Sequence, residues 1–253
     1  MEEKDTKLLN EIMDIVRGCD TIILNADRSK SSIGEKAGHA NFVTSYDKKV
    51  QEQLREKLLA ILPEAVFVGE EEDIHASIEK GYAFIVDPID GTTNFIKDYH
   101  TSAVSVGLTK DGAQYMGVVY NPYLDEMFYA QRGKGAYLNG RRISVSGNPL
   151  KNGIVIFGTS PYYEELNRAS FELAYAYFKK SLDIRRSGSA ALDLCSVAAG
   201  RAELFFELRL SPWDYAAASL IVEEAGGIVT TVEGGKITLG ESCSVLAKNI
   251  KEN

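Results

Sequence analysis

The sequence predicts a fold of the α+β and α/β classes, with an antiparallel sheet in the N-terminal half and a mixed sheet in the C-terminal half. Two observations lead to this prediction. Residues 102–143 form short β-rich segments joined by turn signals, whereas strand-like and helix-like segments alternate from about residue 150 onward. No long linker separates the two parts. We therefore expect two closely packed domains, residues 1–147 and 148–253, with the functional site between them.

Two amphipathic helices are expected to back the antiparallel sheet. Apolar residues recur at helical spacing over Thr6–Ala26, which predicts the first helix. The polar segment Asp27–Asn41, rich in Ser, Gly and Lys, predicts a mobile loop. Thr44 is a residue type that caps helices, so it predicts the start of the second helix, and Pro63 marks its end.

The strands of the N-terminal sheet are bounded by good hairpin turns, Lys110-Asp111-Gly112 and Asn139-Gly140. They are predicted at Ser102–Leu108, Gln114–Tyr120, Met127–Ala130 and on both sides of Asn139-Gly140. In the second half, strands are predicted at Ile154–Gly158, Ser181–Arg185, Ala202–Glu207, Gly227–Thr231 and Ser244–Ala247. The helices between them are predicted at Glu164–Lys180, Ala190–Ala199 and Tyr215–Ala225.

Composition excludes several classes of partner. The chain has 253 residues and a formal charge of −8, without a basic stripe, so nothing points to nucleic acid or an anionic membrane surface as a partner. Three widely separated cysteines indicate free thiols in a reducing compartment. The acidic start is no secretory signal, and no run of about 18 apolar residues could span a bilayer. The sequence therefore predicts a cytoplasmic protein.

The most informative segment is Val86-Asp87-Pro88-Ile89-Asp90-Gly91-Thr92-Thr93-Asn94-Phe95, which follows an apolar strand. Pro88 cannot donate to a sheet ladder, so we expect the strand to end there. Gly91 permits close approach of a ligand, and Thr92 is placed to open a helix. Two carboxylates, Asp87 and Asp90, beside a helix start would repel an anion unless cations lay between. The segment therefore predicts a site that holds metal and phosphate together.

Three other places supply carboxylates at the ends of predicted elements. Glu70 follows the short apolar strand Val66–Gly69, Asp47 lies in the first turn of the second helix, and Asp214 precedes a helix. Taken singly, Asp47 and Asp214 are also explained as helix caps, and Glu70 as part of a solvated acidic turn. Oxygen ligands without clustered histidines favour Mg²⁺, with Mn²⁺ as the alternative, over Zn²⁺.

These motifs resemble those of the inositol monophosphatase family, within the wider group of Mg²⁺-dependent, lithium-sensitive phosphatases. The resemblance extends over nearly the whole chain and implies a layered αβαβα sandwich of the sugar-phosphatase type. It also implies a homodimer. The matching motifs are Val43-Thr44 with Asp47, Gly69-Glu70-Glu71, Asp87–Phe95, Gly133-Lys134-Gly135-Ala136, Asn139-Gly140, Trp213-Asp214 and Glu224-Ala225-Gly226-Gly227. Lys36 resembles a lysine that family members carry in the loop Gly34–His39.

The resemblance implies a site for two or three Mg²⁺ ions. Glu70, Asp87 and the carbonyl of Ile89 resemble the ligands of the first ion. Asp87, Asp90 and Asp214 resemble those of the second ion, so that Asp87 bridges the two. Glu70 would also serve a third, weaker ion.

The resemblance also assigns catalytic and substrate-binding roles. Thr92 and Glu70 resemble the pair that orients the attacking water, and Asp47 supports the threonine. The backbone of Gly91 and Thr92 would receive the phosphate, and Glu207 resembles the acid that holds substrate hydroxyls. The residues expected to contact the substrate are Asp90, Gly91, Thr92, Ser189, Ala190, Glu207 and Asp214.

The expected function is therefore Mg²⁺-dependent hydrolysis of inositol monophosphate or a related sugar or polyol phosphate by metal-activated water. A fructose-1,6-bisphosphatase or a dual inositol and fructose phosphatase is the main alternative. Hydrolysis of 3′-phosphoadenosine 5′-phosphate is a further one. A non-catalytic regulatory module associated with RNA and transcription machinery is the alternative from another functional class.

Overall fold

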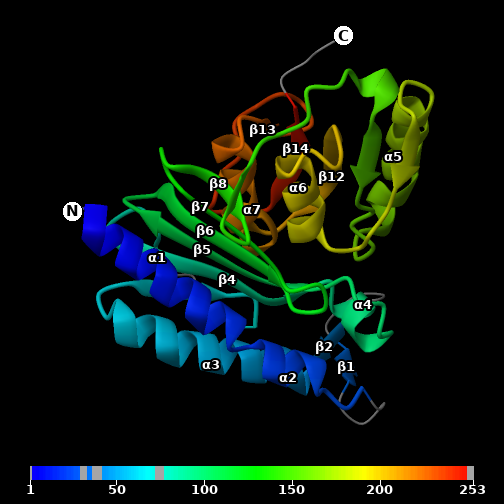
Figure 1. The fold of residues 1–253 in the computed structure, drawn as a ribbon. Helices are drawn as coiled ribbons and strands as arrows, with labels where there is room; N and C mark the ends of the chain where they lie inside the picture. Colours follow the sequence, from blue (N-terminus) through cyan, green and yellow to red (C-terminus); the bar gives the residue numbers. More distant parts are fainter. Residues whose placement is uncertain (1, 29–32, 36–41, 72–76, 250–253) are drawn as a thin grey trace.

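The computed structural model describes residues 2–28, 33–35, 42–71 and 77–249. Two large β-sheets and three groups of helices form five alternating layers (Figure 1). This arrangement confirms the predicted αβαβα sandwich. Within the described part of the chain, no helix is both long and apolar enough to cross a membrane.

The seven-stranded sheet occupies the N-terminal half and has the order β3-β4-β5-β6-β7-β8-β9. Its neighbouring strands are antiparallel except for β3 and β4, which run parallel, so the predicted antiparallel sheet is confirmed. The strands are β3 (Val66–Gly69), β4 (Tyr82–Asp90), β5 (Ala103–Lys110), β6 (Ala113–Asn121), β7 (Glu126–Gln131), β8 (Gly135–Leu138) and β9 (Arg141–Ile143).

The five-stranded sheet occupies the C-terminal half and has the order β11-β10-β12-β14-β13. Strand β10 is parallel to both of its neighbours, whereas β14 is antiparallel to β12 and β13, so this sheet is mixed as predicted. The strands are β10 (Ile154–Phe157), β11 (Asp183–Arg185), β12 (Leu204–Leu210), β13 (Ile228–Thr230) and β14 (Cys243–Lys248), preceded by a 3-10 turn at Leu150–Asn152.

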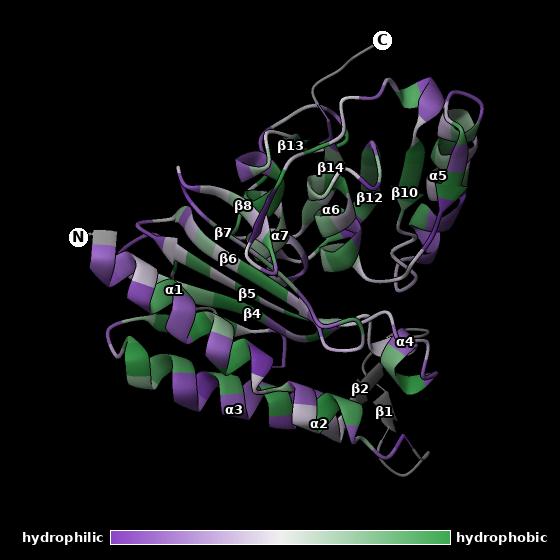
Figure 2. Cartoon of the chain, viewed as in Figure 1, coloured by the Kyte–Doolittle hydropathy of each residue, from purple (hydrophilic) through white to green (hydrophobic). Residues whose placement is uncertain are grey.

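The helices form the outer and middle layers of the sandwich. Helices α1 (Glu2–Arg17) and α3 (Ser45–Ile61) cover the free face of the seven-stranded sheet, and α5 (Glu164–Phe178) covers that of the five-stranded sheet (Figure 1). Helices α6 (Ala190–Ala198) and α7 (Pro212–Glu224) lie between the sheets. The outer helices α1 and α3 alternate hydrophobic and hydrophilic residues, as a half-buried layer requires (Figure 2).

The middle layer draws its apolar core from both halves of the chain. Val119 and Phe128 of the seven-stranded sheet pack in one buried cluster with Leu194 of α6, Ile221 of α7 and Phe205 of β12. The expected boundary between residues 147 and 148 falls in the connection from β9 to β10. The division into two domains stays a prediction, because this shared core joins the two parts.

Helix α7 lies in direct contact with the seven-stranded sheet because two strands carry glycine there. A Cβ atom on Gly117 of β6 would lie 2.5 Å from the carbonyl oxygen of Ala217, and one on Gly107 of β5 would lie 3.1 Å from the Cβ of Ala216. The missing side chains bring the start of α7, with Asp214, toward β4 and β5, where the Ser105 hydroxyl donates to the Trp213 carbonyl at 3.4 Å.

Three expectations about local structure are corrected. The first helix is interrupted: α1 ends at Arg17, and a short helix α2 (Asp20–Leu24) follows. Gly18 is a poor helix former, and the turn there buries Cys19 and Ile23 against the core. A short strand, β1 (Ile33–Glu35), occurs where a loop was expected, and it pairs antiparallel with β2 (Phe42–Thr44), which directly follows that segment. The rest of that segment, including Lys36, lies outside the described residues.

The third correction concerns Pro88, which does not end its strand. Strand β4 continues to Asp90, and its register with β5 shifts between Asp87 and Asp90. Such an irregularity leaves a residue out of the ladder, so the missing N–H of proline costs no sheet hydrogen bond there. The shift also brings two aspartates that are three residues apart to the same end of the sheet.

Candidate active site

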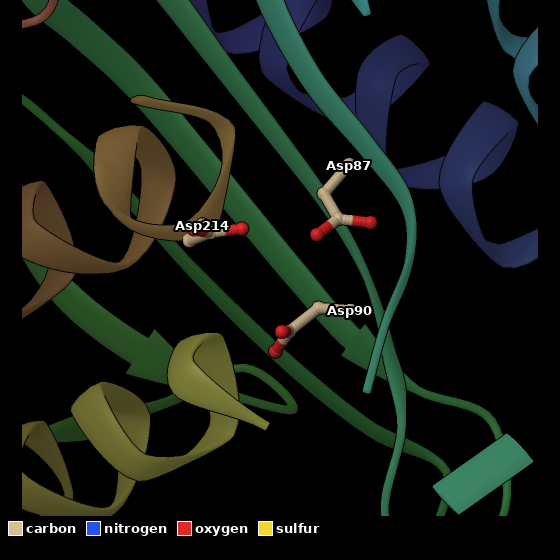
Figure 3. Close-up of side chains that lie close together, drawn as sticks. All are labelled: Asp87, Asp90 and Asp214. Carbon is tan, nitrogen blue, oxygen red and sulfur yellow. The ribbon is translucent and has the colours of Figure 1, made fainter. Parts of the chain in front are cut away.

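The carboxylates of Asp87, Asp90 and Asp214 converge at the end of β4. Each offers an oxygen atom within 4.8 Å of those of the other two. Figure 3 shows the three side chains, two from β4 and one from the start of α7, gathered around a common space. The sequence predicted all three as metal ligands from two segments more than 120 positions apart.

The local backbone explains how β4 presents its aspartates. The Ile89 amide donates to a carboxylate oxygen of Asp87 at 2.9 Å, which fixes that side chain across the turn. Gly91 follows with φ +86°, and a Cβ there would lie 3.0 Å from the Thr101 carbonyl oxygen. Glycine is therefore required at this position, and Thr92 begins the short helix α4 (Thr92–Ile96) directly after it.

Asp90 is held by the start of α6, which belongs to the other half of the chain. The Ser189 hydroxyl and the Ala191 amide, the latter at 2.8 Å, both donate to the same carboxylate oxygen of Asp90. Ser189 also caps α6 by accepting from the Leu192 amide. The expected neighbours Ser189 and Ala190 thus line the cavity beside Asp90.

Thr92 and Asp47 are in contact, as their expected roles require. One carboxylate oxygen of Asp47 accepts from the Thr44 amide at 2.8 Å and forms the capping box of α3. The other oxygen accepts from the Thr92 hydroxyl at 3.3 Å. Asp47 therefore acts as a helix cap and also holds a side chain of the site. Burial raises its pKa to about 6.

Glu70 lies at the end of β3, which runs parallel to β4, and lines the same cavity. Its amide donates to the Val86 carbonyl at 3.1 Å and so continues the pairing of the two strands. Glu70 lies outside the tight group of three carboxylates. Its charge nevertheless raises the pKa of Asp87 and of Asp214, after burial as the larger cause.

The cavity has a volume of about 300 Å³ and a strongly acidic floor. Burial and mutual repulsion raise the pKa of Asp87 and Asp214 well above the ordinary range, and burial raises that of Asp90 to about 6. No histidine or cysteine is among the described residues that line it. Hard divalent cations such as Mg²⁺ or Mn²⁺ match such an oxygen-only donor set and would relieve the repulsion.

Glu207 faces the same cavity from β12, and its setting was not predicted. The amide and hydroxyl of Ser160 donate to one of its carboxylate oxygens at 2.7 and 3.1 Å. A Cβ on Gly158 would lie 1.9 Å from the other oxygen, so only glycine leaves room for this carboxylate. Burial raises the pKa of Glu207 to about 7.

Sequence reasoning missed several residues of the site. Arg209 carried a usable signal, because alternate residues of a strand share a face and Glu207 lies two positions earlier. Asp193 falls one helical turn after Ser189 in α6, which is a second such signal. Other missed lining residues come from two loops without a motif: Ser160, Tyr162 and Tyr163 between β10 and α5, and Arg186 between β11 and α6.

Comparisons with known proteins agree with this site. The sequence pattern of the inositol monophosphatase family matches residues 4–253. The Nus factor SuhB of Vibrio cholerae is 40% identical over 83% of this chain and 78% of its own length. An inositol-1-monophosphatase of Rhizobium meliloti is 38% identical over 84% of this chain and 80% of its own length. A fructose-1,6-bisphosphatase/inositol-1-monophosphatase of Aquifex aeolicus is 38% identical over 80% of this chain and 76% of its own length.

The fold has the same relatives. The crystal structure of the extragenic suppressor protein suhB from Bartonella henselae superimposes with a TM-score of 0.88 at 34% identity, covering 96% of this chain and 94% of that one. Members of the matched family depend on metal ions, in agreement with the acidic cluster. Sequence, fold and family pattern thus agree over nearly the whole length, and the chain belongs to the inositol monophosphatase family.

Proposed function

We propose that this protein is a Mg²⁺-dependent phosphomonoesterase that hydrolyses inositol monophosphate or a related sugar or polyol phosphate. The observation that carries the proposal is the convergence of Asp87, Asp90 and Asp214 in one cavity with the Thr92–Asp47 pair. A phosphate monoester is an anion, and this acidic cavity admits an anion only together with cations.

The donors assigned to the metal ions are Glu70, Asp87, Asp90, Asp214 and the carbonyl oxygen of Ile89. When bound, two divalent ions near one another activate a water nucleophile and stabilise the leaving oxygen. Two or three Mg²⁺ ions, or Mn²⁺ in their place, suit these donors. The Asp90 oxygen that accepts from Ser189 and Ala191 is fixed by them, which orients the rest of the carboxylate toward the cavity.

The remaining residues position the reactants. The Thr92 hydroxyl proton is directed toward Asp47 and the Ile89 carbonyl, so the hydroxyl oxygen is left to accept a hydrogen bond from a water that Glu70 would also contact. The backbone of Gly91 and Thr92 receives the phosphate oxygens. Glu207 accepts hydrogen bonds from substrate hydroxyls, and Ser189 and Ala190 border the same region. Positioning and charge neutralisation are what phosphoryl transfer mainly requires.

The proposal is tested by measuring phosphate release from a panel of phosphomonoesters by the purified protein with Mg²⁺. The panel contains inositol 1-phosphate, fructose 1,6-bisphosphate and 3′-phosphoadenosine 5′-phosphate. We expect the highest kcat/KM with inositol 1-phosphate or another sugar or polyol phosphate. Absence of turnover with every compound, by protein shown to bind Mg²⁺, contradicts the proposal. A dual specificity for inositol and fructose phosphates is supported by the double name of the Aquifex relative.

A regulatory role is the second candidate, because a 40% identical relative is named a Nus factor. In that case the chain would bind RNA or a transcription protein, and the acidic cluster would be dispensable for it. Filter binding to RNA with wild-type protein and Asp90→Asn separates the two functions. Salt-dependent binding that is equal in both proteins would establish the regulatory role beside, or instead of, catalysis.

Two finer expectations stay predictions. The homodimer implied by the family is tested by sedimentation equilibrium. Phe171 of α5 packs its ring edge-on against the buried Phe157 but has 58% of its surface exposed, and this exposed part is available to a partner copy. The cytoplasmic location is tested by fractionation of cells that express the protein.

A further inference from the structure

Arg209 places a positive charge at the mouth of an otherwise acidic cavity. We propose that Arg209, stacked on Tyr163, binds a second anionic group of the substrate and so favours phosphate esters that carry two anionic groups. The inference rests on the proposed phosphatase function and deepens it, because it names a feature of the substrate that the metal cluster does not select.

The backbone holds Arg209 in place independently of its side chain. Arg209 follows Glu207 by two positions in β12, and the register of β12 with β14 shifts between Glu207 and Leu210. The Arg209 amide donates to the Ser160 hydroxyl oxygen at 3.2 Å, and the single Ser160 hydroxyl proton is shared between the Arg209 carbonyl at 2.8 Å and the Glu207 carboxylate at 3.1 Å. One serine therefore fixes both Glu207 and Arg209 at the cavity.

The guanidinium is oriented by an aromatic ring rather than by a carboxylate. Its central carbon lies 4.4 Å from the ring centroid of Tyr163, and both residues line the cavity. Within the described part of the chain, no carboxylate pairs with it. A guanidinium stacked on a ring keeps its N–H edges available, and these edges fit the two oxygens of a phosphate or carboxylate.

The other arginine of this region is already engaged. Arg186 donates to the Thr159 hydroxyl at 3.1 Å. Burial raises the pKa of Asp193 and of Glu207, and the charge of Arg186 partly opposes that rise. Arg186 therefore compensates carboxylates of the protein, whereas no carboxylate of the described residues does the same for Arg209. Of these two arginines, Arg209 is therefore the one whose guanidinium is available to bind a ligand.

A second anionic group needs such a cation in this cavity. Once its phosphate lies at the metal cluster, the far end of a substrate would face the wall that contains Glu207, and Asp193 lines the adjoining part of the cavity. An added negative charge there would be repelled by these carboxylates unless a cation lay within reach. A neutral sugar or polyol phosphate does not need this compensation, so the contribution of Arg209 depends on the substrate.

The test compares matched substrates that differ in one anionic group. Fructose 1,6-bisphosphate is paired with fructose 1-phosphate, and 6-phosphogluconate is paired with glucitol 6-phosphate. The proteins are wild type, Arg209→Gln, Arg209→Lys and the control Arg168→Gln, which removes a positive charge from a side chain that is 90% exposed on α5. For each combination kcat and KM are measured with Mg²⁺ at low and high ionic strength.

We expect Arg209→Gln to raise KM about tenfold for the doubly anionic member of a pair, with a much smaller change for its partner and for kcat. Arg209→Lys should retain most of the preference because it keeps the charge, and Arg168→Gln should retain all of it. The preference should shrink at high salt, since Arg209 is exposed. If Arg209→Gln loses the preference for the doubly anionic substrate only in the bisphosphate pair, Arg209 binds a second phosphate. If the preference is lost in both pairs, Arg209 also binds carboxylates.

Equal losses for both members of each pair would overturn the inference and leave Arg209 as a residue that only packs on Tyr163. The failure of the proposed function looks different, because wild type would then turn over none of the four compounds. In that case calorimetric titration with fructose 1,6-bisphosphate and Mg²⁺ still compares wild type with Arg209→Gln. Equal binding to both proteins, or binding to neither, would again overturn the inference.

Discussion

The two walls of the cavity differ in how their functional residues are distributed along the sequence. The β4 wall takes its functional residues from one continuous segment, Asp87 to Thr92, within which the Ile89 amide donates to Asp87. Distant residues support it, because Ser189 and Ala191 donate to Asp90. The β12 wall consists of Ser160, Glu207 and Arg209, in which residues almost fifty positions apart hydrogen bond to one another. The first wall offers carboxylate oxygens to metal ions. The second wall combines the buried carboxylate of Glu207 with the guanidinium of Arg209. Metal chemistry and substrate choice are therefore expected to respond to different mutations.

The largest expected effect comes from the β4 wall. Asp90→Asn should lower kcat/KM about 10³-fold at ordinary Mg²⁺ concentration, because it removes a carboxylate from the proposed metal donors. The unfolding temperature of the metal-free protein should change little, since the asparagine oxygen can still accept from Ser189 and Ala191. Steady-state kinetics and thermal melting are the measurements. A near-normal rate would show that the β4 wall is not the metal site.

The next effect is a pH dependence of the metal-free protein's stability that comes from Glu207 of the β12 wall. The folded protein raises the pKa of Glu207 from 4.5 to about 7 by burial. Folding therefore favours the protonated form of Glu207. The contribution of this group to the stability of the folded protein is fully present below pH 4.5, and it is lost as the pH rises to about 7. The free energy of unfolding should fall by about 3 kcal/mol from this group over that interval.

Urea unfolding in EDTA between pH 4.5 and 8 measures this dependence. Glu207→Gln should reduce the slope of stability against pH, while the raised pKa values of Asp87 and Asp214 leave a residual slope of the same sign. Identical slopes for wild type and variant would show that Glu207 is ionised without cost in the folded protein.

A smaller effect should be confined to the β12 wall. Gly158→Ala introduces a Cβ atom 1.9 Å from the Glu207 carboxylate, so this side chain must move. We expect KM for a polyol phosphate to rise about tenfold, while Mg²⁺ affinity measured by calorimetry stays unchanged. Loss of Mg²⁺ affinity together with the rise in KM would mean that the two walls do not act separately.

The smallest effect is expected for Ser160→Ala. The variant loses one hydrogen bond to Glu207, at 3.1 Å, but keeps the donation from the Ser160 amide at 2.7 Å. KM should therefore rise only about threefold. Because the same hydroxyl holds the Arg209 backbone, the rise should be larger for fructose 1,6-bisphosphate than for fructose 1-phosphate. The ratio of the two KM values checks this.

The contrast between the walls also explains what the sequence could predict. The β4 wall lies in one motif, so Asp87, Asp90, Gly91 and Thr92 could be named together, and the layered fold followed from the family resemblance. The continuation of β4 past Pro88 was missed because a register shift depends on the partner strand β5. The settings of Glu207 and Arg209 were missed because they depend on Ser160 in a distant loop.

The contact of α7 with Gly107 and Gly117 has a consequence for how variants of this protein should be interpreted. The height of Asp214 above the sheet is set by two positions that bear no side chain and touch no substrate. A random-mutagenesis screen for lost activity should therefore recover substitutions at these remote glycines alongside those at the carboxylates. Such hits would report on the spacing between the layers, and they would be misread if distance from the substrate were taken as evidence of a neutral site.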